Sequence, residues 1–197
     1  MASIDPEDRA KALKFLEWLG QVFEEAGLEA VLIGGQARNF WAEPRTTLDY
    51  DFTTAADAEG FQRLREALTA QGFRIVRDQG PGQPSGPDFV QLRNDATGEA
   101  IDLQAAKTAF QAGIIERGVR LDPGQPLRVA TVEDLLVLKL IADRMKDQAD
   151  LYDLAALKGI DWSYIEHWSQ VWGINERLAG LRQAMEHERR RIEDLYR

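Results

Sequence analysis

The sequence has no cysteine and only two histidines, His167 and His187, among its 197 residues. The lack of cysteine excludes disulfides and thiolate metal sites, and it fits a cytoplasmic protein. Both histidines lie in a predicted helical tail, so we expect neither a histidine-rich zinc site nor a Ser-His-Asp triad in the main domain.

Long apolar runs are also missing from the sequence. None approaches the ~20 residues that a helix needs to span a bilayer, and the start, MASIDPEDRA, has no basic segment leading into an apolar one. We therefore expect no membrane segment and no signal peptide. The net charge of −9 argues against broad nonspecific affinity for nucleic acid, although it is compatible with a local basic patch.

The hydrophobic pattern changes along the chain. The first part contains short apolar or alternating runs that predict strands, among them AVLIGG, TLDYDFT and the hairpin FVQLRN…AIDLQ. VRLDPGQPLRV predicts a second, short hairpin. From TVED, a capping-box type of start, the chain is predicted to be helical. These patterns predict an α+β protein with a mixed sheet and flanking helices over residues 1–130, followed by a C-terminal helical bundle over residues 131–197.

Two aspartates, Asp49 and Asp51, stand two residues apart on a predicted strand and therefore point to the same face. Two carboxylates at this distance repel each other, and a divalent cation would remove the conflict. Carboxylate oxygens suit Mg²⁺. Asp102 lies on a later strand between Ile101 and Leu103 and is the candidate for a third ligand. The alternative is that these acids are merely solvated residues on a strand face.

Two adjacent glycines, Gly34 and Gly35, close an apolar strand and open a short helix. This arrangement can present backbone N–H groups and a helix N-terminus to a phosphate, although it also fits an ordinary turn. Arg45 and Thr47 follow and could hold further phosphate oxygens. Each feature is common by itself, and the order strand, GG, short helix, R-T-T and D-x-D is more specific.

This order resembles the motif of the polymerase-β-like nucleotidyltransferase superfamily, in which GG is followed, here after thirteen residues, by D-x-D. Asp102 falls where that superfamily places its third carboxylate. The stretch IGGQARNF…PRTTLDYDF is most similar to minimal enzymes of the AbiEii type, which act as toxins of bacterial toxin–antitoxin pairs. The resemblance covers roughly residues 28–160 and implies a nucleotidyltransferase-like fold.

A second motif, EDLLVLKLIADRMKDQADLYDL, resembles the helical motif that follows the catalytic half in those toxins. Lys139 stands in it among apolar residues, and the resemblance implies that this lysine reaches the triphosphate of a nucleotide. The same motif supplies Arg144, Asp147 and Asp150 as further residues of the nucleotide site. The alternatives are a lysine that snorkels to solvent and a solvated helix with charge pairs four residues apart.

The reaction that the resemblance implies is transfer of a nucleoside monophosphate from an NTP to an acceptor hydroxyl, assisted by two Mg²⁺ ions. Asp49, Asp51 and Asp102 would be the catalytic metal ligands, and Gly34 and Gly35 would bind the triphosphate. The toxin relatives imply an RNA acceptor, in particular tRNA, and an antitoxin as protein partner. A small-molecule or protein acceptor stays open, as does a nucleotide-binding module without turnover. For RNA we predict a basic rim, formed by Arg38, Arg63, Arg65 and Lys107.

Overall fold

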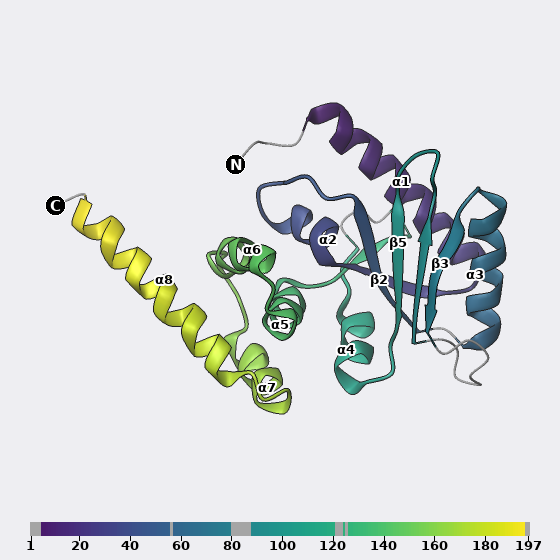
Figure 1. Cartoon of the computed structure of the whole chain (residues 1–197). Coiled ribbons are helices and arrows are strands. Elements are labelled where there is room, and N and C mark those ends of the chain that lie inside the picture. Colours follow the sequence, from purple (N-terminus) through teal and green to yellow (C-terminus); the bar gives the residue numbers. More distant parts are fainter. Residues whose placement is uncertain (1–4, 56, 80–87, 121–123, 125, 196–197) are drawn as a thin grey trace. The chain divides into compact units, whose positions relative to one another are not determined.

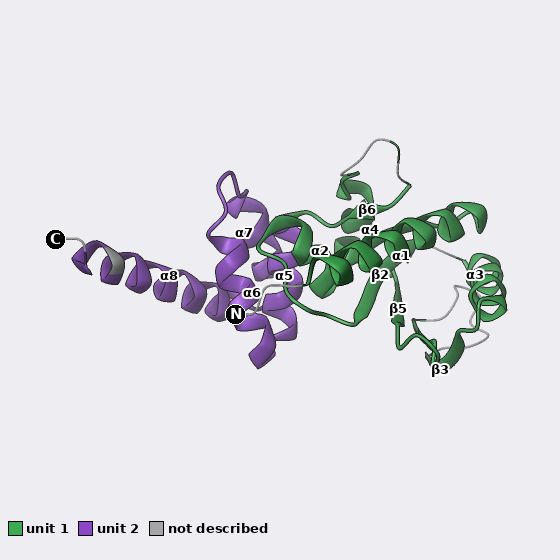
Figure 2. Ribbon diagram, turned by 90° about the horizontal axis from the view of Figure 1, so that it is seen from above, with its two compact units in different colours: residues 1–131 green, residues 132–197 purple. Residues whose placement is uncertain are grey.

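The computed structural model describes residues 5–55, 57–79, 88–120, 124 and 126–195. The chain divides into two compact units, residues 1–131 and residues 132–197 (Figure 2). The first unit is built on a mixed sheet and the second consists of helices, as the hydrophobic pattern predicts.

The sheet of the first unit has six strands in the order β3-β4-β5-β2-β1-β6 (Figure 1). Their bounds are β1 Glu29–Ile33, β2 Asp49–Ala55, β3 Arg74–Gln79, β4 Phe89–Arg93, β5 Ala100–Ala105 and β6 Arg128–Val129. The pairs β3/β4, β4/β5 and β1/β2 are antiparallel, whereas β2/β5 and β1/β6 are parallel. The central strands alternate between buried and more accessible side chains, so each has one face in the core.

Two helices, α1 (Pro6–Glu25) and α3 (Ala58–Ala70), are associated with the buried face. Phe15 of α1 packs on Tyr50 with ring centroids 4.6 Å apart, and Phe23 packs edge-on against Phe52 at 4.8 Å. Tyr50 and Phe52 alternate with the aspartates of β2. Burial of these rings therefore turns the carboxylates toward the other face of the sheet.

The opposite face carries α2 (Gly34–Trp41) and α4 (Ala109–Arg117), both of which contact β1 and β2. The indole N–H of Trp41 donates to the carbonyl of Ala130 at 2.8 Å and so ties the end of α2 to the rest of the unit. The helix α4 begins with a capping box in which Thr108 and Gln111 bond to each other's backbone N–H.

The predicted hairpin of β4 and β5 is confirmed. Of the second hairpin, the described residues show one antiparallel pair, Val119 with Val129, joined by two backbone hydrogen bonds of 2.8 and 2.9 Å. The other neighbour of β6 is β1, with which it pairs in parallel. The edge of β1 offers unpaired backbone groups, and pairing there also buries Val129 against the unit's core. Residues 121–123 and 125 of this segment lie outside the described residues.

The second unit contains the remaining helices, which are α5 (Val132–Ala142), α6 (Met145–Ala155), α7 (Trp162–Val171) and α8 (Asn175–Leu195). Asp143 lies between α5 and α6 with φ of 48°. The Asp161 side chain caps α7 by accepting from the Tyr164 N–H at 3.1 Å. No helix of the described residues is long and apolar enough to cross a membrane.

Candidate active site

The three predicted carboxylates come together on one face of two neighbouring strands. Asp51 on β2 is the register partner of Asp102 on β5, and Asp49 lies one step along β2 on the same face. Asp49 is exposed, whereas Asp51 and Asp102 are half-buried. The sheet therefore brings Asp102 beside two acids that precede it by about fifty residues in the sequence, and the three form one polar cluster.

The pKa of the Asp102 carboxyl is shifted by this arrangement. Burial raises the pKa of Asp102, and the negative charge of Asp49 raises it further. The side-chain amide of Gln91 on β4 opposes the shift by donating to Oδ1 of Asp102 at 2.8 Å, and so does the charge of Arg77 on β3. A cation at this face would favour the ionised form, because it would offset both the burial and the like charge.

Gly34 marks the place where Asp51 meets the start of α2. Its φ is +71°, in the left-handed region that favours glycine, and a Cβ built on it would lie 2.0 Å from Oδ2 of Asp51. Gly35 is similarly close to Thr47, whose Oγ1 would lie 3.0 Å from a Cβ. Both glycines are thus needed for close approach of side chains to the α2 backbone. The N-cap of α2, Ile33, makes no side-chain capping bond, and the acid that lies beside the first turn of this helix is Asp51.

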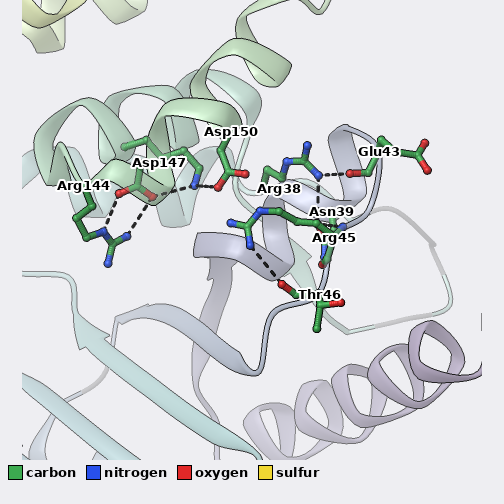
Figure 3. Close-up of polar contacts among 9 residues, drawn as sticks. Arg38, Asn39, Glu43, Arg45, Thr46, Arg144, Asp147 and Asp150 are labelled. Atoms are coloured by element: carbon green, nitrogen blue, oxygen red, sulfur yellow. Dashed lines mark hydrogen bonds and ion pairs between the residues drawn. The ribbon is translucent and has the colours of Figure 1, made fainter. Parts of the chain in front are cut away.

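The R-T-T loop is held against α2 by two amides that the sequence did not single out. Asn39 donates to the Arg45 carbonyl at 2.7 Å and accepts from the Arg45 N–H at 3.1 Å, and Gln36 donates to the Thr47 carbonyl at 3.1 Å. The Arg45 guanidinium donates to the carbonyl of Thr46 at 3.4 Å (Figure 3). These bonds tie the backbone of Arg45 to the second half of α2, whereas Thr47 lies beside Gly35 at the glycine turn. The assignment of Arg45 and Thr47 to phosphate stays a prediction. Asn39 and Gln36 could not be predicted, because no sequence pattern indicates that an amide side chain on a helix bonds to the loop that follows it.

The helical unit contains a buried cluster of the second motif. Lys139 on α5 donates to Asp150 at 2.6 Å and to Asp147 at 3.3 Å, and these three side chains are at most 5% exposed. Arg144 bonds to the same Asp147 at 2.7 Å with its side chain 58% exposed (Figure 3). Burial alone would raise the pKa of Asp147, but the bonds from Arg144 and the charge of Lys139 outweigh it and lower the pKa.

Lys139 consequently does not snorkel, because its ammonium is inside and paired with acids. Direct contact with a triphosphate would require it to exchange these partners for phosphate oxygens. The assignment of Lys139, Arg144, Asp147 and Asp150 to a nucleotide site stays a prediction.

The predicted basic rim is wrong for Arg38, which is buried, and stays a prediction for Arg63, Arg65 and Lys107. Each of the four residues has a partner within the first unit. Arg38 is 1% exposed and donates to the Glu43 carbonyl, and Arg63 donates to the Ala26 carbonyl. Arg65 pairs with Asp78, and Lys107 pairs with Asp88. Arg63 and Arg65 also belong to α3, which is associated with the buried face. Sequence reasoning missed Arg77, whose charge acts on Asp102, because register alone places the two residues near each other.

The donor set of the cluster consists of carboxylate oxygens, the ligands that Mg²⁺ prefers. As the side chains stand, no three His, Cys, Asp or Glu residues within the described ranges form a group that could hold a metal ion. Gln91 occupies only Oδ1 of Asp102, which leaves Oδ2 for a ligand or a proton. The carboxylate oxygens are suitable ligands for Mg²⁺, and the side chains of Asp49, Asp51 and Asp102 would have to move closer together to bind it.

No family model matches this chain, and no curated protein is significantly similar to it in sequence. Solved structures resemble it instead. An antigenic nucleotidyltransferase-like protein from Paracoccidioides brasiliensis is 18% identical over 88% of each chain, with a TM-score of 0.54. The polyadenylate synthase of Megavirus is 14% identical over 75% of this chain and 32% of its own, with a TM-score of 0.50. A lincomycin-bound lincosamide antibiotic adenylyltransferase is 14% identical over 79% of this chain and 99% of its own, with a TM-score of 0.49. The chain thus has the nucleotidyltransferase fold.

Proposed function

We propose that this protein is a Mg²⁺-dependent nucleotidyltransferase, which transfers a nucleoside monophosphate from an NTP to an acceptor hydroxyl. One observation carries the proposal. Asp51 and Asp102 are register partners on neighbouring strands, and the Asp51 carboxylate lies directly against Gly34, at the start of α2. Acids for a metal and N–H groups for a phosphate therefore adjoin, as nucleotidyl transfer requires.

Each residue then has a role. Asp49, Asp51 and Asp102 would hold two Mg²⁺ ions, which when bound supply positive charge for the attacking and leaving oxygens. The N–H groups at Gly34 and Gly35, with Arg45 and Thr47, would bind the triphosphate. Arg144 of the helical unit would add a cation to the phosphates, and Lys139 and Asp150 would support it through Asp147.

The chemical step is a substitution at the α-phosphorus. The acceptor hydroxyl gives its proton to Asp102, its oxygen bonds to the α-phosphorus, and the bond from that phosphorus to the β-phosphate oxygen breaks. Pyrophosphate leaves.

For the acceptor we propose RNA, in particular tRNA, with the protein acting as the toxin of a toxin–antitoxin pair. The resemblance of residues 28–160 to AbiEii-type toxins supports this choice. The main alternative is a nucleotide-binding module that keeps the fold without turnover, and a small-molecule or protein acceptor is a second one.

The experiment measures Mg²⁺-dependent binding of the four NTPs by calorimetry and transfer of α-labelled nucleotide to total RNA. Asp49→Ala and Asp51→Ala are compared with Asp8→Ala, which removes an acid whose side chain is 66% exposed on α1. We expect transfer to disappear in the first two variants and to persist in the third. No NTP binding by the wild type would refute the proposal, and NTP binding without transfer to RNA, small molecules or protein would favour the non-catalytic module.

A further inference from the structure

A row of polar side chains crosses the sheet from its edge to the aspartates. Arg77 on β3 is the register partner of Gln91 on β4, Gln91 is the partner of Asp102 on β5, and Asp102 is the partner of Asp51. Register partners share a face, so these four side chains lie on the same side of the sheet. Neighbouring strands are ~4.8 Å apart, which puts Arg77 about 10 Å of backbone from Asp102, within reach of an arginine side chain.

Two contacts support this row. Gln91 donates to Asp102 at 2.8 Å, and the charge of Arg77 acts on the Asp102 carboxyl. Arg77 is exposed, and its guanidinium carbon lies 5.7 Å from the ring centroid of half-buried Phe89, which shares its face. Two nitrogens of this guanidinium, Nε and Nη2, face the side-chain oxygen of Gln79 on the same strand, so an oxyanion would take the place of this neutral partner or use Nη1.

The acids nearest this row in the sequence are already neutralised. Asp78, next to Arg77, pairs with Arg65, and Asp88, next to Phe89, pairs with Lys107. Neither of these two acids therefore neutralises Arg77, which places a positive charge at the β3 end of the row. A polycationic acceptor would meet repulsion there, whereas an acceptor with a phosphodiester would meet a cation.

We propose that Arg77, held over Phe89, binds an anionic group of the acceptor and thereby directs the acceptor hydroxyl toward Asp102. The proposal rests on the proposed function, and it narrows the acceptor to a phosphate-bearing molecule such as an RNA end. Arg77 is thus a specificity residue of the acceptor side, separate from the residues that bind the NTP.

The test uses the full chain and a labelled 12-nucleotide single-stranded RNA with a 3′-hydroxyl. Binding is followed by fluorescence anisotropy at several salt concentrations, with Mg²⁺ and a nonhydrolysable NTP analogue present. NTP binding is measured separately by calorimetry. Arg77→Gln is compared with Arg77→Lys and with Lys14→Gln, which removes a charge from an exposed position on α1. Tobramycin serves as a polycationic hydroxyl-bearing probe.

We expect Arg77→Gln to weaken RNA binding about tenfold and to reduce the salt slope by ~0.7, the share of one contact to a single-strand phosphate. Arg77→Lys should recover part of both effects, because it keeps the charge without the planar fork. Lys14→Gln should change neither, and NTP affinity should stay the same in all variants. Tobramycin should bind more tightly to Arg77→Gln than to the wild type.

Two results would overturn the inference separately from the function. The first is that Arg77→Gln and Lys14→Gln bind RNA with equal affinity while both bind the NTP normally. The second is that Arg77→Gln binds tobramycin more weakly than the wild type does. Failure of the wild type to bind any NTP would instead refute the proposed function, and this inference with it.

Discussion

Gly34 is a residue for which both the backbone and a neighbouring side chain require glycine. Its φ is +71°, and a Cβ would collide with the Asp51 carboxylate. We expect Gly34→Ala to displace Asp51 and to abolish nucleotide transfer. The left-handed backbone also costs ~1–2 kcal/mol for a residue with a Cβ, so the variant should unfold more easily.

Gly98→Ala is the matched control for this prediction. Gly98 has φ of +85°, but a Cβ there would meet nothing within 4 Å. Both variants therefore carry the same type of backbone strain, and only one of them disturbs an acid. Transfer rates and chemical denaturation are measured for both. If Gly34→Ala were as active as Gly98→Ala, the close approach of Asp51 to the glycine turn would have no role in catalysis.

Asp102 provides a second prediction at the residue scale, from the direction of its pKa. A raised pKa in the folded state means that the ionised carboxylate is less favourable there than in the unfolded chain. This cost is present above the folded pKa and vanishes as the pH falls below the unfolded value of about 3.9. We expect Asp102→Asn to lose transfer but to be at least as stable as the wild type at pH 7 in metal-free buffer.

The measurement is the free energy of unfolding of both proteins at pH 7 and pH 3. The stability advantage of Asp102→Asn should be largest at pH 7 and should shrink at pH 3, where the wild-type carboxyl is protonated. A variant that is clearly less stable at pH 7 would show that Asp102 stabilises the sheet, through Gln91, more than its burial costs.

At the scale of elements, β1, β2 and β5 could be predicted because each has a strong apolar or alternating pattern. The pattern also fixed the face of Asp49 and Asp51, since Tyr50 and Phe52 have to be buried. What it could not supply is register between strands distant in sequence. The pairing of Asp51 with Asp102 could be expected only from the family resemblance, and the position of Arg77 opposite Gln91 could not be expected at all. The two residues of β6 fall at the end of the predicted second hairpin, but their parallel pairing with β1 could not be predicted, because β1 is distant in sequence.

The pair of helices α5 and α6 is joined by the buried cluster of Lys139, Asp147 and Asp150. We expect Lys139→Met to destabilise the helical unit by ~3–5 kcal/mol, because it removes the lysine from Asp150 and leaves Asp147 with Arg144 alone. Lys158→Met, at an exposed position that follows α6, should be nearly neutral. Thermal unfolding at pH 7 compares the two variants.

The same cluster predicts the pH dependence of this effect. The pKa of Asp147 is lowered in the folded state, so its stabilising contribution is present above its ordinary value of about 3.9 and is lost as the pH falls through the folded value. The penalty of Lys139→Met should therefore shrink below pH ~4, when the acids can protonate. A penalty that is equal at pH 7 and pH 3 would mean that lost packing of the lysine stem, and no charge, causes it.

At the scale of the whole molecule, the question is whether nucleotide binding uses the helical unit as well as the sheet unit. Arg144 tests it better than Lys139, because its side chain is 58% exposed and its removal leaves the Lys139 bonds in place. A charged hydrogen bond to phosphate is worth ~1.5–3 kcal/mol, and each ~1.4 kcal/mol is tenfold. We expect Arg144→Gln to raise KM for the NTP by roughly ten- to a hundredfold.

Arg182→Gln is the control, since Arg182 also belongs to the helical unit and pairs with a single acid, Glu166, at 2.6 Å. It should leave KM unchanged. Steady-state transfer kinetics and NTP calorimetry are measured for both variants, with circular dichroism to verify that the helices form. Equal KM values in Arg144→Gln and the wild type would confine nucleotide recognition to the glycine turn and its loop. The ion cluster of α5 and α6 would then serve only the stability of its own unit, even if the aspartates of the sheet proved catalytic.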